Sequence, residues 1–234
     1  MAAPVAARRV LFPLYAFNLE VARAPWVTKE PMIAEMRLQW WRDLLAEVAD
    51  GRPVRRHEVT DALSQVLDPQ GALALDALID VRRWDIYSDA FADQAHFDRY
   101  IEGTSGRLMA TAARLLGRAD DDVVADFAYG VGVANFLRAI PALESAGRRP
   151  LVDGTVEGVR ELAQAALSRI DKARKNKGKV SKAAGAALLS GWQARSVLQR
   201  AVNDPQSVAA GALEPAAFAD RLRLIKVATF GWWH

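Results

Sequence analysis

The most regular pattern of apolar and polar residues in the chain lies at 30–48, which reads EPMIAEMRLQWWRDLLAEV. One apolar row recurs every three or four positions, at Ile33, Met36, Trp40, Leu44 and Val48. A second apolar row, at Leu38, Trp41 and Leu45, widens the apolar face. Because adjacent residues of a helix point roughly 100° apart, Trp40 and Trp41 are both buried only where several helices surround them. The pattern therefore predicts a helix that is buried on more than one side, within a multi-helix layer.

Helical periodicity covers most of the remaining chain, and glycine and proline separate the segments. We predict further helices at 11–24, 59–67, 72–87, 97–116, 120–140, 156–172, 181–202 and 215–225. The first is expected to start near Pro13, and Pro141 is expected to end or kink the segment 120–140. In that segment Gly130, Gly132 and Ala134 should let another helix approach closely. No run of alternating apolar and polar residues indicates a strand, so the predicted fold class is all-α.

The composition is that of one folded domain. With 234 residues, of which 51% are hydrophobic and 25% charged, the chain can bury a sizeable core, and we assign residues 1–234 to a single domain. The absence of cysteine excludes a disulfide scaffold, a zinc–thiolate site and a cysteine nucleophile. No run approaches the roughly 18–20 apolar residues that span a bilayer. The net charge of +3 permits contact with an anionic membrane surface or an acidic partner but requires neither.

Residues typical of catalytic sites are sparse. The three histidines, His57, His96 and His234, are expected to be solvated, and no nucleophile elbow or phosphate-binding loop occurs. Carboxylates four residues apart on a helix can hold Mg²⁺. The chain has three such pairs. We expect Asp43 with Glu47 and Asp122 with Asp126 to be structural, and Asp89 with Asp93 to be solvated in a polar connection.

A basic run, KARKNKGKVSK, occupies 172–182 and carries six lysine or arginine side chains. It contains no aromatic residue that could stack on bases, so nucleic-acid binding is not indicated. We expect this run to be a solvated loop between two helices. An electrostatic contact with anionic lipid is the alternative.

Several ordered motifs resemble the squalene/phytoene synthase family. They are LYAFNLEVAR at 14–23, EPMIAEMRLQWWRDLL at 30–45, DRYIEGTSGRLM at 98–109, ANFLRAIP at 134–141 and GRRPL at 147–151. The resemblance covers about residues 11–155. It implies a helical bundle of the isoprenoid synthase type. Family members usually carry another helix before the first motif, so an N-terminal helix is expected to be missing here.

Active family members join prenyl diphosphates and hold Mg²⁺ with two aspartate-rich helical motifs that face one cavity. Carried over position by position, the four aspartate places hold Ala22, Trp26, Ala139 and Leu143. None of these side chains can ligate Mg²⁺, which requires oxygen ligands. The resemblance therefore implies no catalytic residue, no metal site and no cofactor.

The pattern is similar to the branch of the family that lacks these aspartates, which includes an assembly factor of respiratory complex I. The candidate cavity or binding residues that this resemblance implies are Tyr15, Asn18, Glu20, Arg37, Trp41, Tyr100, Asn135 and Arg138. Asn18 and Glu20 are polar groups in an apolar helix, so we expect each to be paired, with Arg37 or Arg138 as the partner.

Three functional hypotheses follow. The first is a non-catalytic binding or assembly factor that acts on a protein partner, in the cytoplasm or peripheral to the inner membrane. The alternative is an active head-to-head prenyl-diphosphate synthase that uses Mg²⁺ and relocated acids, at Glu20, Asp43, Glu47 and Glu144. The third is a lipid- or isoprenoid-binding module with the tail in the old substrate cavity and the head group on the basic run 172–182.

Overall fold

The computed structural model describes residues 3–28, 30–87, 89–214 and 217–233. Over these ranges the chain is helical and forms no named strand, and an isolated β-bridge joins Ala119 to Val180. The predicted all-α fold class is therefore confirmed.

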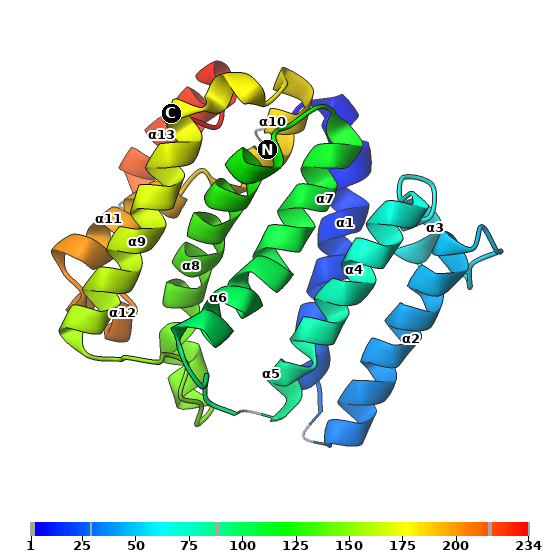
Figure 1. The fold of residues 1–234 in the computed structure, drawn as a ribbon, viewed down its shortest axis with the longest axis horizontal. Coiled ribbons are helices and arrows are strands. Elements are labelled where there is room, and N and C mark those ends of the chain that lie inside the picture. Colours follow the sequence, from blue (N-terminus) through cyan, green and yellow to red (C-terminus); the bar gives the residue numbers. More distant parts are fainter. Residues whose placement is uncertain (1–2, 29, 88, 215–216, 234) are drawn as a thin grey trace.

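The first half of the chain supplies α1 (Val5–Arg23), η1 (Ala24–Trp26), α2 (Pro31–Ala49), α3 (Thr60–Leu63), α4 (Pro69–Arg82), α5 (Trp84–Tyr87), α6 (Gln94–Ile101), the π-helical turn η2 (Glu102–Gly106) and α7 (Arg107–Leu116). The second half supplies α8 (Asp121–Ser145), α9 (Val156–Lys175), η3 (Lys177–Lys179), α10 (Lys182–Leu188), η4 (Leu189–Gly191), α11 (Ala194–Asn203), α12 (Gln206–Ala209) and α13 (Ala217–Phe230). Figure 1 shows α8 in the middle of the bundle between α7 and α9, with α2 along one edge and α11 and α12 along the other.

Helix α8 is the centre of the packing, and its small residues make this possible. A Cβ atom added to Gly130 would lie 2.3 Å from Cγ1 of Ile170 on α9, and one added to Gly132 would lie 2.6 Å from Cγ2 of Ile101 on α6. The predicted close approach of other helices is therefore confirmed. Helix α8 continues through Pro141, so the expectation that the helix ends there is excluded. A proline removes one N–H donor, and the packing of α8 on its neighbours is enough to keep the helix intact.

By length and composition alone α8 could cross a membrane, which differs from the expectation that no such segment exists. Its most apolar 18-residue window has a mean hydropathy of 1.4. However, 72% of that window is buried inside the bundle. The position of α8 in the core accounts for its apolar character.

Helix α2 confirms the predicted helix at 30–48 but not its predicted surroundings. The second apolar row faces the core, since Leu38 and Trp41 are buried. The first row starts on the outside, because Ile33 and Met36 are 40% and 66% exposed, and Trp40 is only partly buried. Helix α2 packs chiefly on α4 at the edge of the bundle (Figure 1). The prediction that helices cover both tryptophans was therefore wrong.

Several helix boundaries also differ from prediction. Helix α1 starts at Val5, so Pro13 lies inside it rather than at its start. Only the short α3 forms within 59–67, and α4 ends before α5 within 72–87. The predicted helix at 97–116 is interrupted by η2, and that at 181–202 by η4. The predicted start of the last helix, at 215, lies outside the described residues.

Candidate functional site

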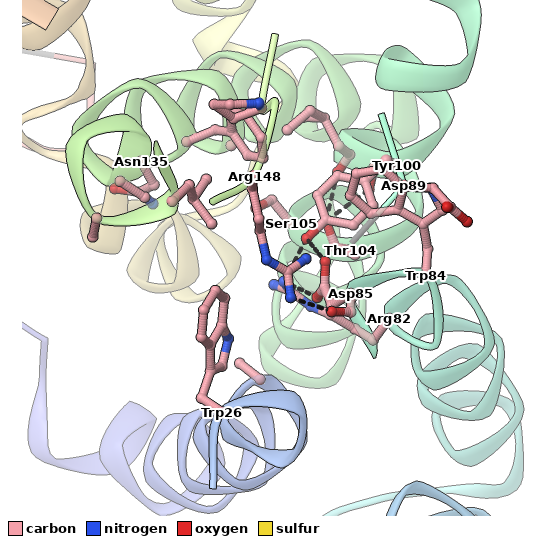
Figure 2. Close-up of a pocket in the computed structure, with 18 of the residues that line it drawn as sticks. Trp26, Arg82, Trp84, Asp85, Asp89, Tyr100, Thr104, Ser105, Asn135 and Arg148 are labelled. Carbon is pink, nitrogen blue, oxygen red and sulfur yellow. Dashed lines mark hydrogen bonds and ion pairs between the residues drawn. The ribbon is translucent and has the colours of Figure 1, made fainter. Parts of the chain in front are cut away.

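A cavity of about 390 Å³ opens between two parts of the bundle. One part is the second half of α8; the other consists of the end of α1, η1, the junction of α4 and α5, and α6 with η2. The loop that follows α8 covers one side of the cavity. Figure 2 shows the lining residues, with Trp26 below the cavity, Asn135 on α8 and a cluster of polar side chains at one end. Its volume falls in the range typical of small-molecule sites, about 300–1,000 Å³.

All four positions that correspond to the family aspartates line this single cavity. Ala22 and Trp26 come from α1 and η1, and Ala139 and Leu143 come from α8. The two segments therefore face one space, as two metal-binding motifs would. Over the part of the chain that the structure describes, no group of three or more His, Cys, Asp or Glu side chains could hold a metal ion. The residues present do not fit Mg²⁺ and diphosphate coordination.

A buried polar cluster forms one end of the cavity. The Arg82 Nη1 atom lies 3.1 Å from Asp85 Oδ2 and donates to the Tyr100 hydroxyl at 2.7 Å; that hydroxyl donates to Asp85 Oδ1 at 2.9 Å. Burial raises the pKa of Tyr100, with a further contribution from Asp85, so its hydroxyl stays protonated. Burial alone would lower the pKa of Arg82, but Tyr100 and Asp85 together raise it, so the guanidinium stays charged. The cluster thus holds a charged Arg82 in a fixed position, paired with Asp85, at the end of the cavity.

Arg148, from the loop after α8, extends across the cavity toward this cluster (Figure 2). Its Nη2 atom donates to the main-chain carbonyl oxygen of Asp85, and its guanidinium lies 4.5 Å from the centre of the Trp26 ring. The neighbouring Arg149 also lines the cavity and is exposed. Among the described residues, neither Arg148 nor Arg149 has a carboxylate within ion-pair distance. The cavity lining therefore holds three arginines, Arg82, Arg148 and Arg149, and two carboxylates, Asp85 and Asp89, so its formal charge is positive.

The predicted binding residues separate into groups. Tyr100 and Asn135 line the cavity. Tyr15 lies outside its lining, and its hydroxyl donates to Ser190 Oγ at 2.8 Å. Trp41 is a core residue, only 4% exposed, that meets other aromatic rings edge-on. Trp41 therefore serves the scaffold, whereas Tyr100 and Asn135 form part of the cavity lining, and their role in binding stays a prediction.

The remaining four candidates, Asn18, Glu20, Arg37 and Arg138, also lie outside the cavity lining. Over the described ranges, neither arginine is hydrogen-bonded to Asn18 or Glu20. The expected pairing with Arg138 was wrong, because Arg138 forms an ion pair with Glu214. Arg37 is exposed on α2. A role for these four residues in binding stays a prediction.

The relocated acids do not converge. None of Glu20, Asp43, Glu47 and Glu144 lines the cavity. Asp43 and Glu144 line two different surface hollows, and Glu47 lies 3.4 Å from Arg55. The geometry that an active synthase with relocated metal ligands requires is therefore not found.

Of the other two carboxylate pairs, Asp122 with Asp126 was expected to be structural, and Asp89 with Asp93 was expected to be solvated. Asp126 is buried and lies 3.0 Å from Arg169 Nε and 2.8 Å from Lys172 Nζ, so it joins α8 to α9. Asp93 accepts a hydrogen bond from the His96 N–H at 2.6 Å and caps α6. Asp89 differs, because it is exposed and lines the cavity.

Two histidines are less solvated than expected. The His57 ring lies 5.4 Å from Trp40 and 5.6 Å from Trp41, and His96 packs 5.9 Å from Trp84. Each fills a gap between aromatic rings rather than facing a reactive group. The third histidine, at 234, lies outside the described residues.

The basic run is not a free loop. It forms the end of α9, then η3, and then the start of α10. Lys172 pairs with Asp126, Lys177 lies 4.9 Å from the centre of the Trp233 ring, and Arg174 donates to the Trp233 carbonyl oxygen. The prediction of a loop was therefore wrong, because most of the run is helical. The prediction that the run is solvated is confirmed for its five lysines, which are exposed although several of them also contact the protein.

Of the polar end of the cavity, the sequence predicted only Tyr100. Arg82, Trp84 and Asp85 each resemble ordinary residues near a helix end, and their meeting with Arg148 depends on a contact between residues 63 positions apart. The signal that could have found them is the GRRPL motif at 147–151, which lies just after the second aspartate region.

Comparisons with known proteins agree with this geometry. The family model described as squalene/phytoene synthase matches residues 1–152. The chain is 26% identical over 153 residues to the Bos taurus protein named NADH dehydrogenase (ubiquinone) complex I, assembly factor 6, covering 59% of this chain and 43% of that protein. A Dictyostelium discoideum homolog of that factor is 24% identical over 221 residues, covering 83% of this chain and 62% of the homolog. The chain thus spans less than two thirds of these relatives' length.

A solved structure described as a dehydrosqualene synthase in complex with ligand has the same fold. It superimposes with a TM-score of 0.79 over 98% of this chain and 88% of that one, at 13% sequence identity. The predicted bundle of the isoprenoid synthase type is thereby confirmed.

Proposed function

The chain belongs to the squalene/phytoene synthase family, and we propose that it is a non-catalytic member that acts by binding, as a factor in the assembly of respiratory complex I. One observation carries this proposal. The four places where the family holds its metal ligands line one cavity and contain Ala22, Trp26, Ala139 and Leu143. Without carboxylates there, the protein cannot neutralise a leaving diphosphate through Mg²⁺.

Similarity to the named assembly factors supports the second half of the proposal. Retention of the fold without the metal ligands is consistent with selection for a surface or a bound molecule rather than for turnover. The protein partner we propose is a subunit or assembly intermediate of complex I. The proposed location is the cytoplasm or the surface of the inner membrane, where such a partner is reached.

A pyrophosphate-release assay tests the absence of catalysis. The full chain is incubated with farnesyl or geranylgeranyl diphosphate and Mg²⁺, beside an active dehydrosqualene synthase as the positive control. We expect no release above buffer. Release that depends on Mg²⁺ and on this protein would contradict the proposal.

The assembly role needs a separate measurement. In cells that lack the gene, native gels should show less assembled complex I, and the wild-type chain should restore it. A variant with all four aspartates restored, at positions 22, 26, 139 and 143, should also restore assembly if the partner-binding surface lies elsewhere. Normal complex I levels without the gene would contradict the assembly role.

A further inference from the structure

We propose that the cavity binds a phosphate-headed amphiphile directly through arginine, without a metal ion. The ligand class is a phosphate monoester on a hydrocarbon chain. This inference rests on the proposed function in one respect, which is that the cavity is used for binding rather than turnover.

The positive charge of the cavity is the first argument. Arg82 is held in place by Asp85 and Tyr100, and its buried Nε atom has no hydrogen-bond partner among the described residues. Arg148 and Arg149, in contrast to Arg82, have no carboxylate partner among the described residues. Three guanidinium groups thus meet two carboxylates, of which Asp85 is already engaged and Asp89 is exposed. A site that lost its metal ligands has kept a cationic end.

The head group follows from this charge. A guanidinium presents parallel N–H donors that match phosphate and carboxylate oxygens. A phosphate monoester carries about −1.5 to −2 charges at pH 7. This charge matches the guanidinium groups of Arg148 and Arg149, neither of which has a carboxylate partner, better than a single carboxylate does. The cation–π contact with Trp26 keeps Arg148 extended and reduces the ordering that binding would require.

The remaining walls favour a hydrocarbon. Phe136, Ala139, Ala142 and Leu143 of α8, together with Trp26 and Ile101, form the apolar part of the cavity lining. Three of these residues, Trp26, Ala139 and Leu143, stand at the family's aspartate positions, where a carboxylate would have to lose hydration beside a hydrocarbon chain. A chain placed against this wall removes apolar surface from water, while its head group meets the arginines.

Titration calorimetry of the full chain in EDTA tests the inference. The probes are farnesyl monophosphate and a lysophosphatidate. Farnesol, which has the hydrocarbon chain without the phosphate, and inorganic phosphate, which has no chain, are the controls. We expect saturable binding of at least one monoester and at least about tenfold weaker binding of farnesol and of phosphate. Preference for lysophosphatidate would assign the head group to a membrane lipid, and preference for farnesyl monophosphate would assign it to an isoprenoid; either outcome supports the site.

Arg148→Gln and Arg149→Gln should each weaken monoester binding about tenfold or more. Arg99→Gln, on the exposed surface of α6 and outside the cavity, should leave it unchanged. Arg149 is exposed, so its variant tests the site even if Arg148→Gln lowers the folding yield.

Failure of both monoesters to bind, binding that requires Mg²⁺, or equal affinity of all three variants would overturn the inference. None of these outcomes alters the pyrophosphate-release result. Conversely, metal-dependent pyrophosphate release would contradict the proposed function even if a monoester bound in EDTA.

Discussion

Replacing Gly130 with alanine should destabilise the protein, although alanine is the better helix former. The added Cβ would lie 2.3 Å from Ile170 Cγ1, 2.7 Å from Ile170 Cδ1 and 3.0 Å from the main-chain oxygen of Ala166. The Ile170 side chain can rotate away only into a packed core, and the carbonyl of α9 is fixed by its helix. Overpacking of this kind costs about 1–3 kcal/mol, and helix propensity returns about 1 kcal/mol. We expect a net loss of about 1–2 kcal/mol because the backbone contact limits relaxation.

Urea unfolding followed by circular dichroism measures this loss, which corresponds to a fall in Tm of about 2–4 °C per kcal/mol in a chain of this size. Gly106→Ala is the matched control, since the nearest atoms to its added Cβ lie 3.8 Å away, and it should be neutral or stabilising. Ile170→Ala should cost less in the Gly130→Ala background than in the wild type, because it removes the clashing atoms. A Gly130→Ala variant as stable as the wild type would refute the reasoning.

Three further predictions concern the site and the stability of the scaffold. A variant with aspartate at positions 22, 26, 139 and 143 together should bind Mg²⁺. In differential scanning fluorimetry its Tm should rise on adding Mg²⁺, whereas the Tm of the wild type should not. An unchanged Tm would show that the two segments are not oriented as metal motifs. The hydrogen bond from Arg114 lowers the pKa of Asp68 to about 2, so the pair stabilises the folded state fully above about pH 4 and loses this contribution as the pH falls through 2. Asp68→Asn, which can still cap α4, should therefore cost less than about 1 kcal/mol at neutral pH, and urea unfolding should show that cost shrinking toward pH 2. Trp41→Ala should lower the free energy of unfolding by about 3–5 kcal/mol without changing monoester affinity, and a large affinity loss in a folded variant would move Trp41 from scaffold to site.

Helix positions in this protein follow from periodicity, but helix surroundings do not. The segment 30–48 shows two apolar rows, and the segment forms a helix, as predicted. Periodicity reports which residues are apolar and not which neighbouring element covers them. Met36 therefore remained exposed at the edge, while the less regular segment that became α8 lies at the centre. Its glycines were the better indication, because small residues are needed where helices approach from several sides.

The cavity likewise has one part that the sequence could predict and one part that it could not. The resemblance to squalene/phytoene synthases was enough to identify Ala22, Trp26, Ala139 and Leu143 as positions that share one site, because the family's two aspartate motifs could be carried over residue by residue. The arginine end could not be found in this way. Arg82 and Arg148 meet only through the path of the loop after α8, and neither residue type distinguishes a ligand-binding role from an ordinary surface ion pair.

The edge position of α2 has a consequence for how the protein opens. Helix α2 rests mainly on α4, whereas α8 is enclosed by α7, α9, α11 and η2. Detaching α2 would expose one buried face and leave the central helices packed, so this helix can open as a local cooperative unit. Its backbone amides should exchange with deuterium well before those of α8, while the cavity wall on α8 stays protected. Met32 and Met36, already on the outer surface, would then mark the face of the least stable part of the molecule.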